Sequence, residues 1–95
     1  MYARVARWEG SSPEDLQAMA DQIQQSDGPP PGVPGKGITF LFDQESGTSL
    51  AIALFDTQED LETGDAALNS MNPPDDVSGS RVSVEKYEVG ADRRL

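Results

Sequence analysis

The spacing of apolar residues changes along the chain and marks its structural elements in turn. Residues 50–55 are apolar at every position. A strand with one face in water would alternate between apolar and polar residues, so we predict that this strand is covered on both faces. The run 38–42 predicts a preceding strand, and the polar segment 43–48 predicts a turn in which Gly47 can adopt a positive φ. The centre of the chain is therefore expected to be a β-hairpin.

Two segments with helical spacing flank this hairpin. Ser12 is a predicted N-cap, because Pro13 suits the first helical position after it, and this helix is expected to end near Ser26. Thr57 repeats the arrangement before a second helix over 58–70. Each helix has one apolar face, which should pack on the sheet. The faces consist of Leu16, Met19, Ala20 and Ile23 in the first helix, and of Leu61, Gly64, Leu68 and Met71 in the second.

The remaining two strands complete a known pattern. Alternating residues predict strands at 2–9 and 81–89, so the element order is β-α-β-β-α-β. This order predicts an α+β fold of the ferredoxin-like class, a four-stranded antiparallel sheet with two helices on one face. The expected strand order is 4-1-3-2, which places the strand over 50–55 in the centre of the sheet.

The second cover of this central strand is expected to come from another copy of the protein. The 95 residues form a single domain, 1–95, which is too small to build two covering layers. Leu50, Ile52 and Leu54 share one face of the strand and are bulky. We therefore predict that they meet the partner in a homodimer.

The opposite face of the same strand carries little side-chain volume. Ala51 and Ala53 share this face with Phe55. Beneath a helix that carries Gly64, small residues would leave space for a ligand pocket. The alternative to a pocket is that the helices simply lie closer to the sheet. Gly64 itself would either permit close approach to a strand or a ligand, or be merely tolerated at a cost of ~1 kcal/mol relative to Ala.

Composition excludes several classes of function. The chain has no cysteine and no histidine, which removes disulfides, the commonest general base and the usual zinc and haem ligands. Lys+Arg 7 against Asp+Glu 17 give a formal net charge of −10, which opposes binding to nucleic acid or to an anionic membrane surface. No apolar run approaches the ~18 residues of a membrane span, and the N-terminus lacks a signal-peptide core. We expect a soluble, cytoplasmic protein with no metal site and no cofactor.

Two arginines on the first strand are the most informative polar residues. Arg4 and Arg7 lie on a central strand of the predicted sheet, and a buried guanidinium needs a carboxylate or an acidic ligand to offset its desolvation. One interpretation is that an arginine binds an anionic or phenolate oxygen in the pocket. The other is an ion pair with Glu85 or Glu88 of the neighbouring last strand. Trp8 shares a face with Arg4 and is either pocket wall or core.

Several short segments together carry a family resemblance. They are Tyr2-Ala3-Arg4-Val5, Gly35-Lys36-Gly37, the strand-to-helix junction 53–61, and the last strand 81–89. Through these segments the chain resembles the dimeric α/β-barrel superfamily and, within it, the antibiotic biosynthesis monooxygenase-like proteins. The resemblance implies a homodimer whose two sheets pack face to face, with a pocket between the sheet and the helices of each subunit.

The family includes oxygenases that need no metal or flavin, haem-degrading enzymes, and many members without an assigned activity. Phe55 matches an aromatic position at the end of the third strand, where haem-degrading members have a pocket-lining Trp. Those members also use a His on the second helix and an Asn on the first strand. This chain has no histidine, and its first strand offers Val5 and Arg7 instead of Asn. We therefore expect that haem is not a ligand.

Two functions remain after this reasoning. The first is a cofactor-independent oxygenase, or a related enzyme, acting on a small aromatic or polyketide-like molecule. It would need only a pocket, access for oxygen, and a hydrogen-bond donor such as Arg4, Arg7 or Tyr87. The second is a non-catalytic homodimer that binds a small ligand or has a structural role. No residue of the chain is assigned a catalytic role by its sequence pattern.

Overall fold

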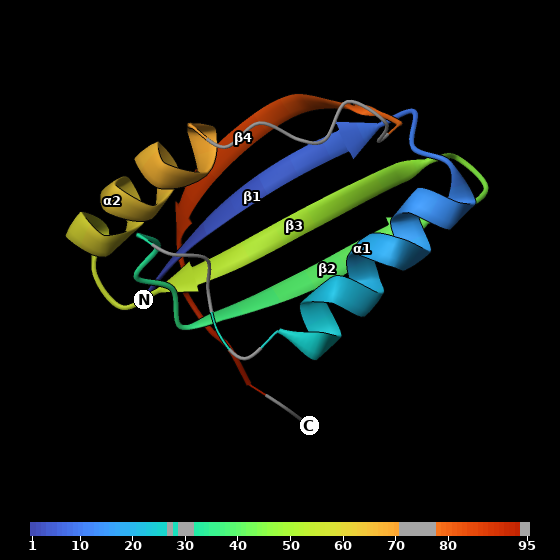
Figure 1. The fold of residues 1–95 in the computed structure, drawn as a ribbon. Helices are drawn as coiled ribbons and strands as arrows, with labels where there is room; N and C mark the ends of the chain where they lie inside the picture. The colour runs from blue at the N-terminus through green and yellow to red at the C-terminus, as the bar shows by residue number, and fades with distance from the viewer. Residues whose placement is uncertain (27, 29–31, 71–77, 94–95) are drawn as a thin grey trace.

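The computed structural model describes residues 1–26, 28, 32–70 and 78–93 of the chain. Its elements follow the predicted order, with bounds within two residues of the predicted ones (Figure 1). Met71, which was predicted to lie on the apolar face of the second helix, is outside the described residues. The acidic segment 72–76 and the prolines at 29–31 are outside them too. The elements are β1 (Tyr2–Glu9), α1 (Pro13–Gln25), β2 (Gly37–Asp43), β3 (Thr48–Phe55), α2 (Gln58–Asn69) and β4 (Ser80–Glu88).

The four strands form one antiparallel sheet in the order β2-β3-β1-β4, which confirms the predicted strand order. This is the ferredoxin-like α+β fold. In the central pair, Arg4 lies opposite Ala53, and on the other side of β1 it lies opposite Lys86. The pairing of β1 with β4 shifts register between Arg7 and Trp8, where a bulge interrupts the regular alternation of β4.

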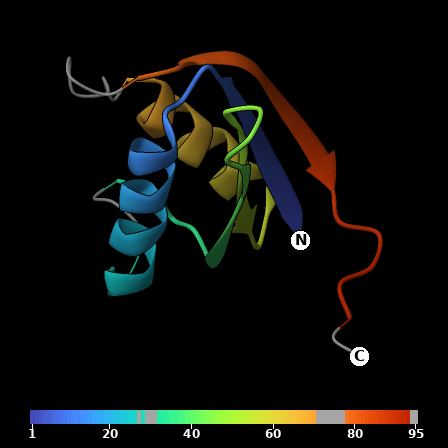
Figure 2. The ribbon, with the colours of Figure 1, turned by 90° about the vertical axis from the view of Figure 1, so that its right-hand side faces the viewer.

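Both helices of the described residues lie on one face of the sheet, and the other face carries neither of them (Figure 2). Each helix begins as its sequence predicts, because the hydroxyl oxygen of Ser12 accepts from the backbone N–H of Asp15 at 3.2 Å, and that of Thr57 accepts from Asp60 at 3.0 Å. In the described residues, no helix has both the length and the apolar content that a membrane crossing requires.

The core is concentrated under α2. Phe55 is fully buried, and Leu61 and Val33 are buried beside it. A Cβ added at Gly64 would lie 2.6 Å from Cζ of Phe55, so the missing side chain of this glycine is what allows the ring to fit beneath the helix. The close approach expected at Gly64 is therefore an approach to a strand side chain.

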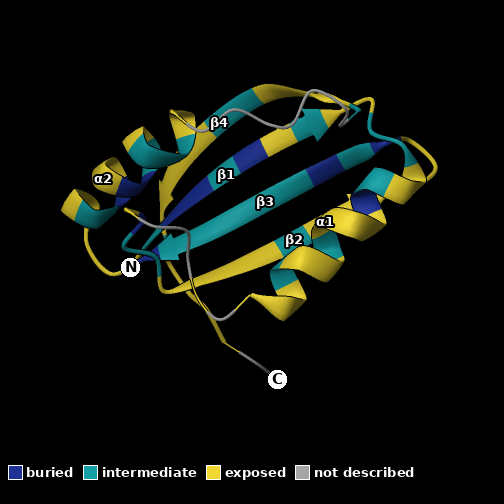
Figure 3. Cartoon of the chain, in the orientation of Figure 1, coloured by how far each residue is buried: buried dark blue, intermediate teal, exposed yellow. Residues whose placement is uncertain are grey.

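The α1 half of the helix layer is packed more thinly (Figure 3). Leu16 is the buried residue of α1, whereas Met19 of the predicted apolar face is 42% exposed. On β2, Ile38 is 50% exposed and Phe42 is 37% exposed. The physical reason is position: α1 lies against β2 at the edge of the sheet, and no further strand extends the sheet beneath it.

The start of α1 is tied to the segment that precedes β4. The carboxylate of Asp15 accepts from both the backbone N–H and the hydroxyl of Ser78, and the hydroxyl of Ser78 also accepts from the backbone N–H of Ser12 at 2.7 Å. Hydrogen bonds from Ser78 hold the pKa of Asp15 below its ordinary value. Gly47 has the predicted positive φ, and its carbonyl accepts from the N–H of Ser11 at 3.1 Å. These contacts join the start of α1 to the segment before β4 and to the turn between β2 and β3.

The Phe55–Gly64 contact predicts whether a larger residue at position 64 stabilises or destabilises the protein. Gly64→Ala should lower the free energy of unfolding by about 1–3 kcal/mol, because the added methyl group overpacks a buried ring. In a Phe55→Leu background the clash is relieved, and the same substitution should raise stability by up to about 1 kcal/mol through helix propensity. Urea unfolding of the four proteins measures both effects. A stabilising Gly64→Ala in the presence of Phe55 would contradict the packing described.

Candidate functional site

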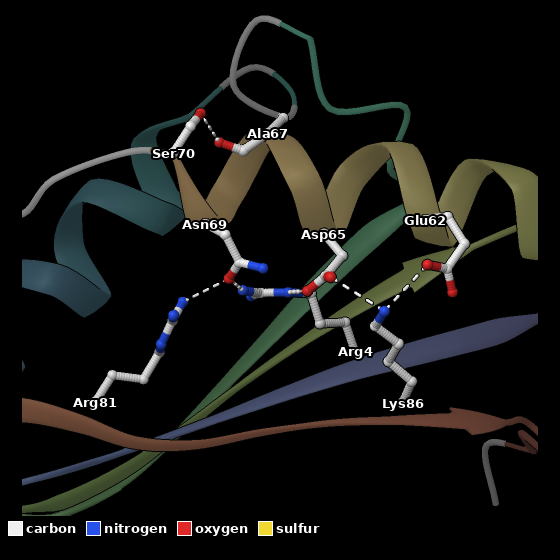
Figure 4. A network of polar contacts seen from close by, with 8 residues as sticks. All are labelled: Arg4, Glu62, Asp65, Ala67, Asn69, Ser70, Arg81 and Lys86. Carbon is white, nitrogen blue, oxygen red and sulfur yellow. Dashed lines mark hydrogen bonds and ion pairs between the residues drawn. The ribbon is translucent and has the colours of Figure 1, made fainter.

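A buried arginine on the central strand β1 organises the polar residues under α2. Arg4 is 5% exposed. Its Nε donates to Oδ1 of Asp65 at 2.8 Å, and its Nη2 donates to Oδ1 of Asn69 at 2.9 Å (Figure 4). Both acceptors belong to α2, so the guanidinium joins this helix to the centre of the sheet.

Strand β4 contributes two more cations to the same group. Nζ of Lys86 lies 3.1 Å from Oδ2 of Asp65 and 3.1 Å from Oε2 of Glu62. Nη1 of Arg81 donates to Oδ1 of Asn69 at 2.9 Å, so this amide oxygen accepts from two arginines. Figure 4 shows the line of side chains along α2 that faces these cations. We call the six residues the polar network: Arg4, Glu62, Asp65, Asn69, Arg81 and Lys86.

The local sequence explains how this network forms. Glu62, Asp65 and Asn69 are three and four residues apart, so they share one side of the helix. This polar side lies next to the apolar side that contains Leu61 and Gly64. When the apolar side packs on the sheet, the polar side is brought over β1 and β4.

The network is electrostatically satisfied. Burial raises the pKa of Asp65, but hydrogen bonds and charges from Arg4 and Lys86 outweigh burial, so the pKa lies below its ordinary value. The pKa of Lys86 is raised by its bonds to Asp65 and Glu62. Within the described part of the chain, every buried polar side-chain atom has a hydrogen-bond partner. Such a network stabilises the position of α2 and leaves no buried group in need of a ligand.

A groove of about 430 Å³ lies beside the network, between α2 and β4. Asp65 and Asn69 form one wall, and Arg81 and Lys86 are on the other. A second hollow of about 330 Å³ lies at Gly32–Pro34 and Thr63. In the ranges the structure describes, no three Asp or Glu side chains come together as metal ligands would.

The structure separates the two arginines that the sequence singles out. Arg4 makes an ion pair, as one interpretation expected, but Glu85 and Glu88 were the wrong partners, because the carboxylate comes from Asp65 of α2. Arg7 lies on the opposite face of β1, exposed, with Nε 2.9 Å from Oε2 of Glu9. The carboxylate comes from α2 because this helix lies over the face of β1 that carries Arg4, whereas Glu85 lies on the opposite face.

Tyr87 and Trp8 also lie apart. Tyr87 lies opposite Ala3 on the helix-free face and is 52% exposed, and its hydroxyl donates to Glu85, which raises the pKa of Tyr87. Trp8 is half-buried on the helix side, opposite Ser49. The three proposed donors, Arg4, Arg7 and Tyr87, therefore do not converge on one space.

The remaining pocket candidates form part of the core. Phe55 fills the space beneath Gly64, and Ala53 packs partly buried against the same cluster. Neither of the two hollows is lined by these residues. The sequence correctly predicted that Ala51, Ala53 and Phe55 share the face beneath the helices. It did not predict that the ring of Phe55 would fill the space beneath Gly64.

The predicted interface residues share the helix-free face of β3. Leu50, Ile52 and Leu54 are each half-buried within the single chain. Their strand neighbours on this face include Val5, opposite Ile52, and Leu41, opposite Leu50. Leu41 is 49% exposed. Together these five residues form an apolar patch, which we call the face patch.

Sequence reasoning missed most of the polar network. One signal was available. Arg4 shares a face of the central strand β1 with Tyr2, and Tyr2 lies opposite Phe55 on the helix side. The partner of Arg4 was therefore to be sought in the helix layer. The polar side of α2 was the place to search. The members missed were Asp65, Asn69, Arg81, Glu62 and Lys86.

No protein-family model matches this chain, and comparisons with curated proteins and with solved structures found no match. The ferredoxin-like fold therefore rests on the observed topology alone. Membership of the antibiotic biosynthesis monooxygenase-like proteins stays a prediction.

Removing one partner of the buried ion pair tests the structural role of the network. Asp65→Asn should lower the free energy of unfolding by about 3 kcal/mol at neutral pH, because it leaves Arg4 buried without a counter-charge. Glu62→Gln is the control, since its exposed pair with Lys86 contributes little. Denaturant unfolding measures both. Equal effects of the two substitutions would contradict the central position of Asp65.

The depressed pKa of Asp65 also predicts a pH dependence. A carboxyl group whose pKa is lower in the folded state stabilises the fold above its ordinary pKa of 3.8 and loses that contribution as the pH falls through the folded value. The acid-induced loss of stability below this ordinary value should therefore be shallower in Asp65→Asn than in the unchanged protein. Unfolding curves at a series of acidic pH values provide the measurement. Identical slopes would show that Asp65 is not stabilised in its charged form.

Proposed function

We propose that this chain is a non-catalytic homodimeric module of the dimeric α/β-barrel type, in which the helix-free faces of two sheets pack together. The observation that carries the proposal is the face patch on strands β1, β2 and β3. Leu50, Ile52 and Leu54 lie on β3, one of the two central strands of the sheet, yet neither helix of the described residues covers them.

The apolar composition of the surface supports this partner. Large exposed apolar patches on small domains mark interaction sites. A second sheet fits such a surface, because sheets stack face to face at about 10 Å and interlock their side chains. Two charged residues stand next to the patch on the same face, because Arg7 of β1 lies opposite Leu50 and Glu85 of β4 lies opposite Val5. A partner sheet must therefore also accommodate the exposed Arg7, which is paired with Glu9. The family resemblance supports the same arrangement.

The geometry favours a non-catalytic role. Arg4 is engaged by Asp65 and Asn69, and Arg7 and Tyr87 lie on the opposite face of the sheet. The region beneath α2 is filled by Phe55. An oxygenase that works without a cofactor must hold its substrate beside a hydrogen-bond donor that stabilises developing charge. Arg4, Arg7 and Tyr87 line neither of the two hollows described above.

A cofactor-independent oxygenase is the second candidate function, and one observation favours it. Ala51 and Ala53 are half-buried on the helix side, and Ala53 packs against the core cluster, so the helix layer covers this part of the strand incompletely. A small aromatic molecule could be bound on this surface. The two functions differ in oxygen consumption: the proposed module should consume none with an electron-rich phenol such as 1-naphthol. Uptake that Ala53→Leu abolishes would favour the enzyme.

The dimer is tested by one substitution and a matched control. At about 10 µM the unchanged protein should elute as a dimer in gel filtration with light scattering. Ile52→Lys should give monomers or unfold the protein, because it would bury an unpaired charge between the sheets. Ile38→Lys makes the same chemical change on the helix side of β2 and should leave the dimer intact. A folded monomer of 10.2 kDa for the unchanged protein would overturn the proposal.

A further inference from the structure

Strand β2 ends the sheet on one side and presents its outer edge to solvent. Six of its seven residues are exposed and the seventh is half-buried. An edge strand offers unpaired backbone N–H and C=O groups to any chain that can align with it. The outer edge of β2 is therefore open to the addition of a strand.

The two edges of the sheet differ in chemistry. The β4 edge carries charged side chains along its length, including Arg81, Lys86 and Glu88. Charges of this kind protect an edge from pairing with another strand. The β2 edge has the sequence Gly-Ile-Thr-Phe-Leu-Phe-Asp, and its single charge stands at the end. The β2 edge therefore lacks the protection that the β4 edge has.

The exposed apolar residues of β2 lie on both faces of the strand. Ile38 and Phe42 lie on the helix side, opposite Ala53 and Ser49, whereas Leu41 lies on the helix-free side. A second sheet packed on the face patch could cover Leu41, but it could not reach the helix side. A strand placed alongside β2 would cover residues on both faces at once.

We infer that β2 pairs antiparallel with β2 of a second copy of this chain, around a two-fold axis at Phe40. In this register Ile38 of each copy lies opposite Phe42 of the other, and Thr39 lies opposite Leu41. Apolar residues meet apolar residues on the helix side, which is the cross-strand pairing that stabilises antiparallel sheets. The sequence 38–42 is thus complementary to itself, which favours a copy over an unrelated strand.

Charge at the ends of the strand agrees with this register. Lys36 precedes β2 and Asp43 ends it, so antiparallel pairing brings each lysine close to the other copy's aspartate. Lys36 is engaged by Asp56 at 3.3 Å, but both side chains are exposed, so the lysine can exchange partners at little cost. The β2 ends therefore attract one another although the two chains as wholes repel.

The net charge of −10 makes this association weak and dependent on salt. Two acidic copies repel, and salt screens that repulsion. A single edge pair also buries less surface than a standard interface. We expect pairing at high protein concentration that strengthens with ionic strength. This edge pairing is separate from the face-to-face dimer proposed above and does not require it. Where edge pairing and face packing both occur, two dimers join into a larger assembly.

Three double variants at the exposed positions test the register. Ile38→Glu with Phe42→Glu, and Ile38→Lys with Phe42→Lys, place like charges opposite each other. Ile38→Lys with Phe42→Glu places opposite charges there. All three remove the same apolar side chains, and the two like-charge variants bracket the net charge of the third. Each is made in the unchanged protein and with Ile52→Lys, which separates edge pairing from face packing.

Sedimentation equilibrium at protein concentrations from about 10 to about 300 µM, at low and high salt, measures the association. The Ile52→Lys protein should form dimers that tighten with salt. Both like-charge variants should weaken this association by at least about tenfold, and the opposite-charge variant should restore it at low salt. If Ile52→Lys does not fold, the same comparison is made in the unchanged protein.

A single introduced cysteine gives an independent reading, because the chain has none of its own. Phe40→Cys should form a disulfide-linked dimer under mild oxidation, since paired residues at the two-fold axis bring their Cα atoms within about 6 Å. Glu88→Cys on the β4 edge should not. Lack of association at the highest concentration, or equal behaviour of the three double variants, would overturn the proposal. Loss of the face dimer alone, with edge pairing intact, would instead overturn only the function proposed above.

Discussion

The fit of the Phe55 ring beneath the bare backbone of Gly64 determines how the rest of the structure is arranged. A fully buried aromatic side chain cannot shift without leaving a void, and any residue larger than glycine would push α2 away from the sheet. This contact sets the height of the helix above β1. At that height, Asp65 and Asn69 come within hydrogen-bond distance of Arg4. If the helix lay farther from the sheet, the charged guanidinium of Arg4 would be left without its partners.

The same contact explains why the polar network is structural in character. Arg4 is buried because α2 lies close, and it can be buried because α2 supplies a carboxylate and an amide oxygen. Lys86 and Arg81 complete the bonding from β4, so no described buried polar atom is left for a ligand. Satisfied networks make a helix position specific. Chemistry at this place would first require breaking these bonds.

The two halves of the sheet are stabilised unequally, and this inequality organises the molecular surface. Under α2 the core is dense and the polar network adds charged pairs between the helix and the sheet. On the other side, α1 contributes Leu16 as its buried residue and leaves the edge strand β2 exposed. The helix-free face adds a second uncovered apolar area around Ile52. The edge of β2 offers unpaired backbone groups to another strand, and the apolar face around Ile52 offers side chains to another layer. The proposed interactions follow from what this small domain leaves uncovered.

The elements, their order, the helix caps at Ser12 and Thr57 and the strand order could all be predicted from the amino-acid sequence, because they depend on local spacing and on the few topologies that such an order allows. The sequence also placed Leu50, Ile52 and Leu54 on one face and Ala51, Ala53 and Phe55 on the other. The partner of Arg4 depended on tertiary structure, since Asp65 is 61 residues away and the sequence pointed instead to Glu85 or Glu88 of the neighbouring strand. The space beside Ala53 was likewise decided by the orientation of one ring. Side-chain pairing across layers depends on distances of a few ångströms, and these are set only when the helix comes to rest on the sheet.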